Sequence, residues 1–454
     1  MKTESVKSYK QAEAYLYDVP KFTTKSTPEM TRAFYEFLGC PGETRNIIHV
    51  AGTNGKGSVC TYLSRVLTAH GHKTGVFTSP HLVSMCERFR IDGSLMEEEE
   101  FVSLFNRVME KVKQVKDLLA SGEAPGELKG LTESYHPTFF EYLFFMAMLW
   151  FEDKGVDDIV LETGLGGRLD ATNVITAPVL CLITRIGLDH TEYLGETLDK
   201  VAEEKAGIIK NNIPLIFTDS DPVSTEVIKK VANRQGAKAY AVGKTNVSKL
   251  KIHENFIDFC VDYGYYSDVC PAEVNVKLPT IATYQTENAA MAILAAHLLL
   301  KEDMNREVLL CTLSETVWSG RMEEVRPNLY VDGAHNEDGI EAFIRCLKDI
   351  GEKNGILIFG VSRDKNYKEM LLRLVREVEW SRIITVSFRN PRSGSATELK
   401  TLLEENGIQN PEAASDVREA LKMCYPDGNG KRVYVVGSLY LVGEVKELMM
   451  EEIL

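Results

Sequence analysis

Short apolar runs alternate with amphipathic segments along most of this chain. Before residue 220 the apolar runs predict strands over 46–50, 73–78, 157–162, 179–184 and 213–218. Nearly continuous apolar strands separated by segments of helical period are typical of a parallel sheet covered by helices on both faces. Residues 8–40 differ, because their pattern predicts two helices around a turn at 25–28. The hydrophobic pattern therefore predicts an α/β fold.

The pattern changes character between residues 239 and 278. Runs such as 256–261 and 274–278 favour an antiparallel β elaboration of the first domain. We expect a helix over about 284–301 to close that domain. The Gly-, Pro- and Glu-rich stretch 118–137 predicts a mobile surface loop.

A second α/β series begins after the segment 318–321. Its predicted strands cover 329–331, 356–359, 383–388 and 433–436, with helices between them. A chain of 454 residues is long enough for two cores. We therefore predict a first domain over 1–320 and a smaller, Rossmann-like domain over 321–454.

The amino-acid composition disfavours several classes of binding partner. The formal net charge is −14, which disfavours a protein that coats nucleic acid. Nine cysteines without a C-x-x-C pair predict neither a disulfide framework nor a zinc knuckle. The first residues lack an apolar signal core, and the most apolar stretch, 139–151, is too short to span a bilayer. We expect a cytoplasmic monomer without membrane or nucleic-acid partners.

A glycine-rich segment joins the first predicted strand to a helical pattern over 59–70. Backbone N–H groups at such a helix start, together with the helix dipole, form a cradle for phosphate. A lysine there can neutralise phosphate, and a serine hydroxyl can reach phosphate or Mg²⁺. This segment predicts nucleoside triphosphate binding by Gly52, Thr53, Asn54, Gly55, Lys56, Gly57 and Ser58. The common P-loop differs, since there Gly-Lys is followed directly by Ser or Thr.

Other polar residues follow predicted strands of the first domain. Glu162 ends one strand and precedes a glycine-rich stretch over 163–170, while Asp189 and His190 follow another. Ser79 follows a third. Ligands of open α/β sheets bind at the carboxyl ends of the strands, so these groups are candidates for a Mg²⁺ site beside the triphosphate. Imidazole is a less usual ligand of Mg²⁺.

Lys205 lies on the predicted helix after His190 and has two possible roles. An unmodified ammonium would be repelled by Mg²⁺ and would more naturally contact phosphate. A lysine carbamylated by CO₂ would instead be an anion able to ligate metal. The residues alone leave both possibilities open.

In the second domain, Asp332 and His335 follow a predicted strand and precede a helix. Asp332 is a candidate to accept hydrogen bonds from ribose or to position an arginine. His335 is a candidate to meet an anionic or reacting group. Their place beside the joint between the domains favours a functional interpretation over ordinary turn chemistry.

Taken together, these segments resemble the Mur ligase superfamily, and most closely its folate branch, the folylpolyglutamate and dihydrofolate synthases. The matching segments run in family order along the chain. They are 49–58, 78–82, 162–173, 189–190, 204–209, 318–321, 332–336 and 437–444.

The resemblance implies a P-loop Mur-ligase-type ATPase domain, a Rossmann-like second domain, and ATP with Mg²⁺ as cofactors. It places Ser79, Glu162 and His190 at metal-binding positions, and Lys205 at the position of a carbamylated lysine. Asn288, Arg321 and Asp332 match residues that hold ATP. His335 and Ser438 match positions that handle the incoming glutamate. The pterin-binding positions correspond to Thr138, Phe140 and Asp170.

Two segments depart from the family pattern. Many relatives have Gly-Leu-x-Arg near the N-terminus, where this chain has the segment 26–32. Many also carry His-Gln before the ATP-binding Asn288, where this chain has Tyr284-Gln285. The first departure bears on the pterin contacts and the second on nucleotide packing.

These observations predict an ATP-dependent ligase that adds L-glutamate to tetrahydrofolate, and also to dihydropteroate, through an acyl phosphate. We expect Lys56, Lys205, His190 and His335 to act in catalysis. One alternative is a Mur-type ligase acting on a cell-wall nucleotide precursor, which the segments 138–141 and 165–170 disfavour. A second is a nucleotide-binding switch without catalysis, for which Glu162, His190 and Lys205 would have no use. A nicotinamide dehydrogenase is disfavoured because neither glycine-rich segment matches G-x-G-x-x-G.

Overall fold

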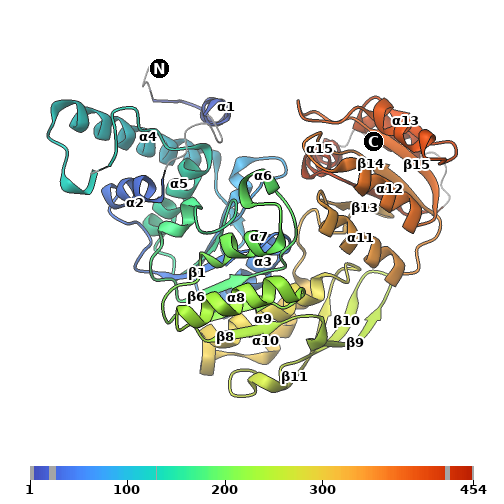
Figure 1. The fold of residues 1–454 in the computed structure, drawn as a ribbon, viewed down its shortest axis with the longest axis horizontal. Helices are drawn as coiled ribbons and strands as arrows, with labels where there is room; N and C mark the ends of the chain where they lie inside the picture. The colour runs from blue at the N-terminus through green and yellow to red at the C-terminus, as the bar shows by residue number, and fades with distance from the viewer. Residues whose placement is uncertain (1–4, 20–26, 129, 425–429, 452–454) are drawn as a thin grey trace.

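Two α/β domains lie side by side in the computed structural model, which describes residues 5–19, 27–128, 130–424 and 430–451 (Figure 1). The larger domain, blue to yellow in Figure 1, holds the N-terminal helices and the longer sheet. The smaller domain, orange to red, holds the rest of the chain. The expected α/β class is confirmed.

The large domain is built on an eight-stranded sheet in the order β4-β3-β2-β5-β1-β6-β7-β8. Six of these strands are parallel where they pair with one another: β1 (Asn46–Ala51), β2 (Thr74–Phe77), β5 (Asp158–Glu162), β6 (Leu180–Ile183), β7 (Leu215–Thr218) and β8 (Ala239–Val242). The antiparallel strands β3 (Phe89–Ile91) and β4 (Ser94–Leu95) extend one edge. The hydrophobic pattern predicted five of the parallel strands and missed this extension.

Helices cover both faces of this sheet because its strands are apolar on both sides. In β1, Ile48 and Val50 pack with α3 (Lys56–Ala69) and α9 (Gln285–Leu300). Ile47 faces the opposite way and packs with α4 (Glu98–Ser121) and α5 (Phe139–Lys154). On that second face, α7 (Leu198–Ala206) and α8 (Pro222–Arg234) cover β6 and β7. The N-terminal helices α1 (Tyr9–Asp18) and α2 (Pro28–Phe37) join the α4–α5 cluster.

The structure corrects two predictions in this domain. Residues 239–242 were expected in the antiparallel elaboration, but β8 pairs in parallel with β7 because its buried positions continue the main sheet. The stretch 118–137 is not simply a surface loop. It includes the last turn of α4, and Leu128, Leu131 and Tyr135 are buried in the core below it. Part of the turn expected at 25–28 lies outside the described residues.

The expected antiparallel elaboration is a separate three-stranded sheet. It consists of β9 (Val247–Ile252), β10 (Ile257–Asp262) and β11 (Glu273–Leu278), in the order β11-β10-β9. Along β11 the side chains alternate between exposed and buried, as expected for a sheet with one solvated face. In Figure 1 this sheet lies below the small domain, next to α9 and α10 (Arg306–Glu315).

The small domain has a six-stranded sheet in the order β12-β13-β17-β14-β15-β16. Its parallel strands are β13 (Leu329–Asp332), β17 (Val433–Val436), β14 (Gly355–Phe359), β15 (Trp380–Val386) and β16 (Glu412–Ala414). The edge strand β12 (Glu323–Arg326) pairs antiparallel with β13. The pattern missed β12 and β16, which are short and only partly buried.

Helices cover both faces of the small sheet as well. They are α11 (Glu337–Asp349), α12 (Tyr367–Glu377), α13 (Ala396–Glu405), α14 (Val417–Cys424) and α15 (Leu439–Met450). The nine cysteines form no disulfide among the described residues. In the described part of the chain, no helix has the length and hydropathy to cross a bilayer.

Candidate active site

The glycine-rich loop lies between the end of β1 and the start of α3, at the carboxyl edge of the large sheet. Gly55 caps α3 with a φ of 92°, a left-handed conformation that favours glycine. A side chain there would also collide with the Asn288 amide. At Gly57 a Cβ would lie 2.8 Å from the Trp318 ring, so the joint segment packs directly on the loop. The loop geometry is that of an anion-binding helix N-terminus.

Lys56 is folded back over the loop. Its Nζ donates hydrogen bonds to the carbonyl oxygens of Gly52 (3.1 Å) and Thr53 (3.3 Å). It also lies 3.8 Å from Oε1 of Glu162, which is buried at the end of β5. Burial raises the pKa of Glu162, while the positive charges of Lys56, Arg321 and Arg88 act in the opposite direction. Several cations therefore surround one buried carboxylate beside the loop.

Glu162 and Ser79 form the part of the predicted metal site that the structure brings together. The Ser79 backbone N–H donates to Oε2 of Glu162 at 3.1 Å. Among the described residues, no group of three or more His, Cys, Asp and Glu side chains is arranged to hold a metal. Mg²⁺ is usually held by one or two carboxylates together with substrate phosphates and water. The donors present fit such a site, which phosphate oxygens would complete.

Lys205 is buried on α7, and its Nζ donates to the carbonyl oxygen of Gly52 at 2.8 Å. Burial, reinforced by the charge of Lys56, lowers the pKa of Lys205 to about 7. A large fraction of this side chain is therefore a neutral amine near neutral pH. Neutral amines react with electrophiles such as CO₂, whereas ammonium groups do not.

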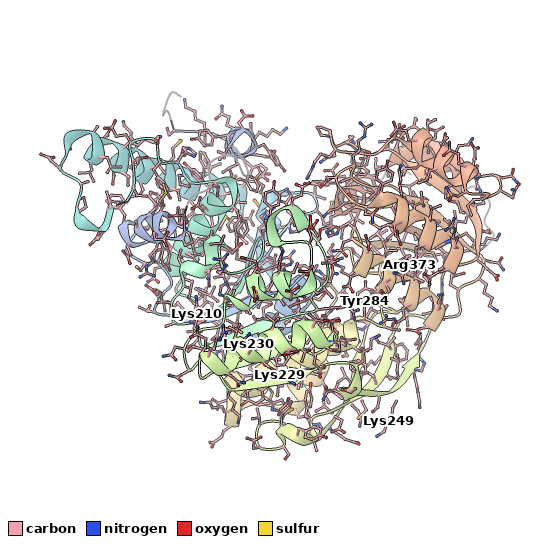
Figure 2. The ribbon with its side chains drawn as sticks, in the orientation of Figure 1. Lys210, Lys229, Lys230, Lys249, Tyr284 and Arg373 are labelled. Atoms are coloured by element: carbon pink, nitrogen blue, oxygen red, sulfur yellow. The ribbon has the colours of Figure 1, made fainter. Side chains whose placement is uncertain are left out.

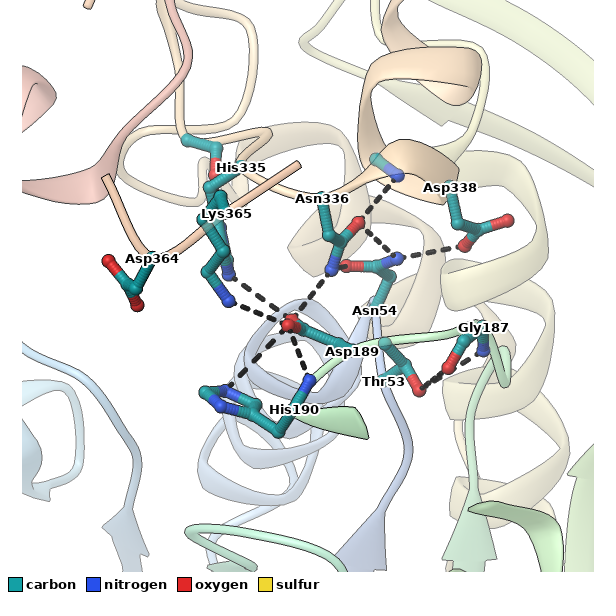
Figure 3. A network of polar contacts seen from close by, with 12 residues as sticks. Thr53, Asn54, Gly187, Asp189, His190, His335, Asn336, Asp338, Asp364 and Lys365 are labelled. Carbon is teal, nitrogen blue, oxygen red and sulfur yellow. Dashed lines mark hydrogen bonds and ion pairs between the residues drawn. The ribbon is translucent and has the colours of Figure 1, made fainter. Parts of the chain in front are cut away.

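Asp189 is the centre of a polar network that joins the two domains (Figure 3). Its carboxylate accepts from Nζ of Lys365 (2.6 Å) and Nδ2 of Asn336 (2.9 Å), both from the small domain. Nε2 of His335 lies 3.6 Å from the same carboxylate. Burial would raise the pKa of Asp189, but the hydrogen bond and charge of His335, with the charges of His190 and Lys365, hold it well below its usual range. Asp189 is therefore an anion that attracts groups from the opposite domain.

A second interdomain network lies beside the first. Nδ2 of Asn54, in the glycine-rich loop, donates to Asp338 at 2.8 Å and to Asn336 at 3.2 Å. Nε of Arg185 also donates to Asp338, at 2.8 Å. The Thr53 hydroxyl donates to the Gly187 carbonyl oxygen at 2.9 Å, so Thr53 holds the loop to the segment that carries Asp189. The nucleotide loop is thus linked directly to the start of α11.

His190 follows Asp189 and has a left-handed backbone, with a φ of 49°. Its Nε2 lies 3.9 Å from Oδ1 of Asp189. Burial lowers the pKa of His190 to about 4; the negative charge of Asp189 opposes this effect, and the positive charges of Lys365 and Lys56 reinforce it. The imidazole is neutral at neutral pH, which is the form that can ligate a metal.

A cavity of about 270 Å³ lies between the domains. Six predicted ATP-binding residues line it: Asn54, Gly55, Ser58, Asn288, Arg321 and Asp332. Gln285 aligns two of them, since its Nε2 donates to the Ser58 hydroxyl and its Oε1 accepts from Asn288. The position of this cavity suits a nucleotide whose phosphates reach the loop.

Tyr284 occupies the position at which many relatives carry histidine. Its hydroxyl donates to Oδ2 of Asp332 at 2.5 Å, and the backbone N–H groups of Met322 and Ala334 also donate to that carboxylate. Burial raises the pKa of Asp332, which the charge of Arg321 opposes. Figure 2 shows Tyr284 between the domains, whereas Lys229 and Lys230 lie on α8. Tyr284 therefore links the large domain to Asp332 of the small domain across the joint.

The predicted pterin-binding residues lie around the glycine-rich stretch 163–170. Thr138 caps α5 together with Glu141. The ring of Phe140 packs against Gly164, where a Cβ would lie 2.6 Å away. The Asp170 carboxylate accepts from the backbone N–H groups of Gly164 and Leu165, both at 2.9 Å, and from Thr172. Asp170 thus holds the stretch in shape on the side that faces Phe140.

The residues predicted to handle glutamate lie in two small-domain loops. Nδ1 of His335 contacts the Gly333 carbonyl oxygen at 2.8 Å, which leaves Nε2 directed toward Asp189. Ser438 is buried and caps α15 by accepting from the Tyr440 N–H at 3.2 Å. His335 follows β13 and Ser438 follows β17, and these strands are neighbours.

Sequence reasoning missed three charged residues of the site. Lys365 and Asp338 reach the interdomain networks from the small domain, and Arg185 reaches them from the large domain. Lys365 and Arg185 follow strands, so the rule that located His190 would have found both. Asp338 lies in the first turn of α11, where an acidic residue is ordinary and carries no separate signal.

Comparisons with known proteins identify the family of this chain. The model of the Mur ligase middle domain matches residues 109–296, and that of the dihydrofolate synthetase C-terminal domain matches residues 318–449. The dihydrofolate synthase/folylpolyglutamate synthase of Bacillus subtilis (strain 168) is 33% identical over 452 residues, which cover 97% of this chain and 99% of that protein. The folylpolyglutamate synthase of Lacticaseibacillus casei is 28% identical over 98% of this chain and 99% of its own length.

Solved structures of folylpolyglutamate synthases match the fold of this chain. The folylpolyglutamate synthase of Mycobacterium tuberculosis in complex with ADP and AMPPCP superposes with a TM-score of 0.83 at 25% identity, covering 98% of this chain and 99% of that one. The E. coli FolC structure in complex with DHPP and ADP gives a TM-score of 0.81 at 26% identity, covering 99% and 100%.

Proposed function

Because this chain belongs to the folylpolyglutamate and dihydrofolate synthase family of Mur ligases, we propose that it is an ATP-dependent ligase that joins L-glutamate to a folate carboxylate. One observation carries the proposal. The phosphate-binding loop of the large domain lines an interdomain cavity together with Asp332, and His335 and Lys365 of the small domain meet Asp189 of the large domain beside it. Such a site can activate an acid on one side and supply an amine from the other.

The first step moves the γ-phosphoryl group of ATP onto the folate carboxylate. A bond forms between a carboxylate oxygen and the γ-phosphorus, the bond from that phosphorus to the β–γ bridging oxygen breaks, and ADP leaves. Such transfers depend mostly on alignment and charge stabilisation. In our proposal, Lys56 leaves its carbonyl partners and follows the migrating charge, and the N-terminus of α3 holds the phosphates. Asn288, Arg321 and Asp332 hold the rest of the nucleotide.

Glu162, Ser79 and His190 would hold Mg²⁺, which when bound would offset the phosphate charge. Lys205 would be carbamylated there, because its near-neutral pKa supplies the amine that CO₂ requires. The Gly52 carbonyl oxygen, which accepts from Lys205, would orient that side chain toward the loop.

In the second step the neutral amine of glutamate attacks the acyl carbon, the bond from that carbon to the phosphate oxygen breaks, and the proton lost by the amine leaves with the phosphate. We assign His335 and Ser438 to orienting the glutamate, with Lys365 supplying a positive charge beside them. Closure of the domains around Asp189 would exclude water, which would otherwise hydrolyse the acyl phosphate.

The deciding assay uses purified protein with ATP, Mg²⁺ and glutamate, and offers tetrahydrofolate or dihydropteroate separately. We expect phosphate release that requires both glutamate and a folate, and a product heavier by one glutamyl unit. ATP turnover without a folate requirement would contradict the proposal. Muramyl nucleotides serve as the comparison substrates for a cell-wall ligase.

We also propose dihydrofolate synthase activity. The support is the stretch 163–170, where the Asp170 carboxylate accepts from the Gly164 N–H and the ring of Phe140 packs against Gly164. Thr138 caps α5, the helix that carries Phe140. Glutamylation of dihydropteroate in the same assay tests this second activity independently of the first.

We place the domain boundary at residues 320 and 321, and we propose that the enzyme works as a cytoplasmic monomer on small molecules. The support is that one chain supplies both sides of the cavity. Light scattering of the purified protein with and without ATP tests the oligomeric state. A dimer as the active species would contradict the proposed monomeric state.

A further inference from the structure

Two neighbouring loops of the small domain carry arginines that the proposed chemistry does not use. Arg363 follows β14, and Arg392 lies in the loop after β15. The loops are joined, because the Arg363 N–H donates to the Arg392 carbonyl oxygen at 2.8 Å and Ser362 bridges Ser393. We call Arg363 and Arg392 the arginine lip. Both belong to the strand edge that also carries His335 and Ser438, since β13, β17, β14 and β15 are parallel neighbours.

The charges of the arginine lip are only partly neutralised. Arg363 is exposed, and its guanidinium has no hydrogen bond or ion pair with the described residues. Arg392 is half exposed, and the Asp364 carboxylate lies 3.8 Å from its guanidinium. Arg389, on the same loop, differs because Glu444 (3.1 Å) and Glu447 (3.7 Å) pair with it. Two cations of this edge therefore remain available to an anionic ligand.

Tyr440 fixes the lip on the cleft side of the domain. Nη2 of Arg392 donates to the Tyr440 hydroxyl at 2.6 Å, and the guanidinium lies 5.2 Å from the centre of that ring. Tyr440 lies on α15, and this helix packs against the large domain, since a Cβ at Gly443 would collide with the backbone of Leu82. Tyr440 therefore belongs to a helix at the contact between the two domains.

Arg88 connects this region to the reaction centre. It is buried, its Nε donates to Nδ1 of His81 at 2.9 Å, and its charge acts on Glu162. Arg88 and His81, with the adjacent Leu82, thus lead from the region of Glu162 to α15, whose Tyr440 contacts the arginine lip. A chain extending outward from the reacting carboxylate along this line would meet cations at both ends.

We propose that the arginine lip binds the α-carboxylates of an oligo-γ-glutamyl chain on the folate substrate. The inference rests on the proposed function, which adds one glutamyl unit and one net negative charge in each cycle. A protein with a net charge of −14 repels such a ligand overall, so local cations are needed to hold it. Guanidinium groups suit carboxylates because they can donate two parallel hydrogen bonds.

The test compares substrates of different tail length under identical conditions. KM is measured for tetrahydrofolate carrying one or three glutamyl units, with the wild-type chain, Arg392→Gln, Arg363→Gln and the double variant. Lys230→Gln is the matched control, because it removes one exposed positive charge on α8. The measured quantity is the KM ratio of the triglutamate to the monoglutamate.

We expect each arginine variant to raise this ratio about threefold and the double variant about tenfold, with smaller effects at high salt. Lys230→Gln leaves the ratio as in the wild type. An unchanged ratio in the double variant, or an equal change in Lys230→Gln, would overturn the proposal.

Binding of a labelled γ-tetraglutamate peptide, measured by fluorescence anisotropy at low salt, provides a readout without turnover. We expect the double variant to weaken binding about tenfold relative to wild type and Lys230→Gln. Equal binding of the peptide by the double variant and the wild type would overturn the proposed role of the arginine lip, even if ligase activity is present. Absence of any folate glutamylation by the wild type would instead reject the proposed function, so the two failures are distinguishable.

Discussion

The two domains build their halves of the site in different ways. In the large domain, Lys56, Glu162 and Lys205 are held by backbone groups of the same domain, and Glu162 and Lys205 are buried. In the small domain, Asn336 and Lys365 are held largely by contacts with the opposite domain. The phosphate-loop side of the site is therefore held within the large domain, whereas the small-domain side depends on contacts across the joint. Variants in the two halves should fail differently.

The largest expected effect is at the phosphate loop. Lys56→Ala removes the cation that follows the γ-phosphoryl group, and we expect kcat to fall about a thousandfold because charge stabilisation dominates such transfers. The fall in kcat is measured as the rate of ADP release coupled to product formation. Lys229→Ala, an exposed lysine on α8, is the control. A folded Lys56→Ala enzyme with wild-type kcat would rule out this role.

The second largest loss of activity is expected from substitution of Lys205. Lys205→Ala and Lys205→Arg both remove the amine that reacts with CO₂, so we expect each to lose about a hundredfold in kcat. Labelled bicarbonate should give the wild type a carbamate signal by ¹³C NMR that both variants lack. As pH falls through about 7 the Lys205 amine takes up a proton, and the signal should decline with it. Full activity in the Arg variant would exclude carbamylation as a requirement.

Closure of the two domains can be weakened by a substitution outside the nucleotide loop. Asp189→Asn removes the negative charge that attracts Lys365 and His335, and we expect a loss of about tenfold in kcat/KM for glutamate with little change in ATP affinity. Small-angle X-ray scattering with ATP bound should show a larger radius of gyration. Asp268→Asn, whose ion pair with Lys238 is exposed, is the control. Equal losses for ATP and glutamate would indicate instead that the two halves are one rigid unit.

The smallest effect on activity, with a clear effect on stability, is expected at His49. This side chain is fully buried in β1, where Nε2 contacts the Thr172 hydroxyl at 2.8 Å, and burial lowers its pKa to about 3. The unfolded chain binds a proton at this position between about pH 6.5 and 3 while the folded chain does not. Stability is therefore lost as pH falls through that window, by up to roughly 1.4 kcal/mol per pH unit.

His49→Gln keeps an N–H group near Thr172 but does not titrate. Denaturant unfolding at pH 7 and pH 5 should show a smaller loss of stability in this variant than in the wild type. His253→Gln, in the loop between β9 and β10, should behave as the wild type does. An identical pH dependence in all three proteins would show that His49 does not contribute to acid unfolding.

Some features followed from local sequence. The apolar runs at 46–50 and 157–162 predicted buried parallel strands, because such strands need apolar residues on both faces. The spacing of glycines at 52, 55 and 57 predicted the phosphate loop, because those positions require unusual backbone angles or close packing. Glu162 and His190 were found because each follows a strand.

Other features had no local signal. The strands β12 and β16 gain stability from their neighbours and not from an apolar pattern, so their residues resemble loop residues. Residues 239–242 have the composition of either sheet, and only pairing with β7 assigned them to the large one. Asp338 looks like any acidic residue at a helix start until Asn54 and Arg185 approach it.

The sequence by itself determined the class of chemistry, because glycine, lysine and carboxylate positions at strand ends are fixed within a few residues of one another. Only the tertiary structure decided which of these groups share a site. Asn54 and Asn336 are 282 positions apart and meet across the joint, and the burial that lowers the pKa of Lys205 comes from packing around α7. Distances and burial of this kind depend on how two separate cores come together, which no local pattern records.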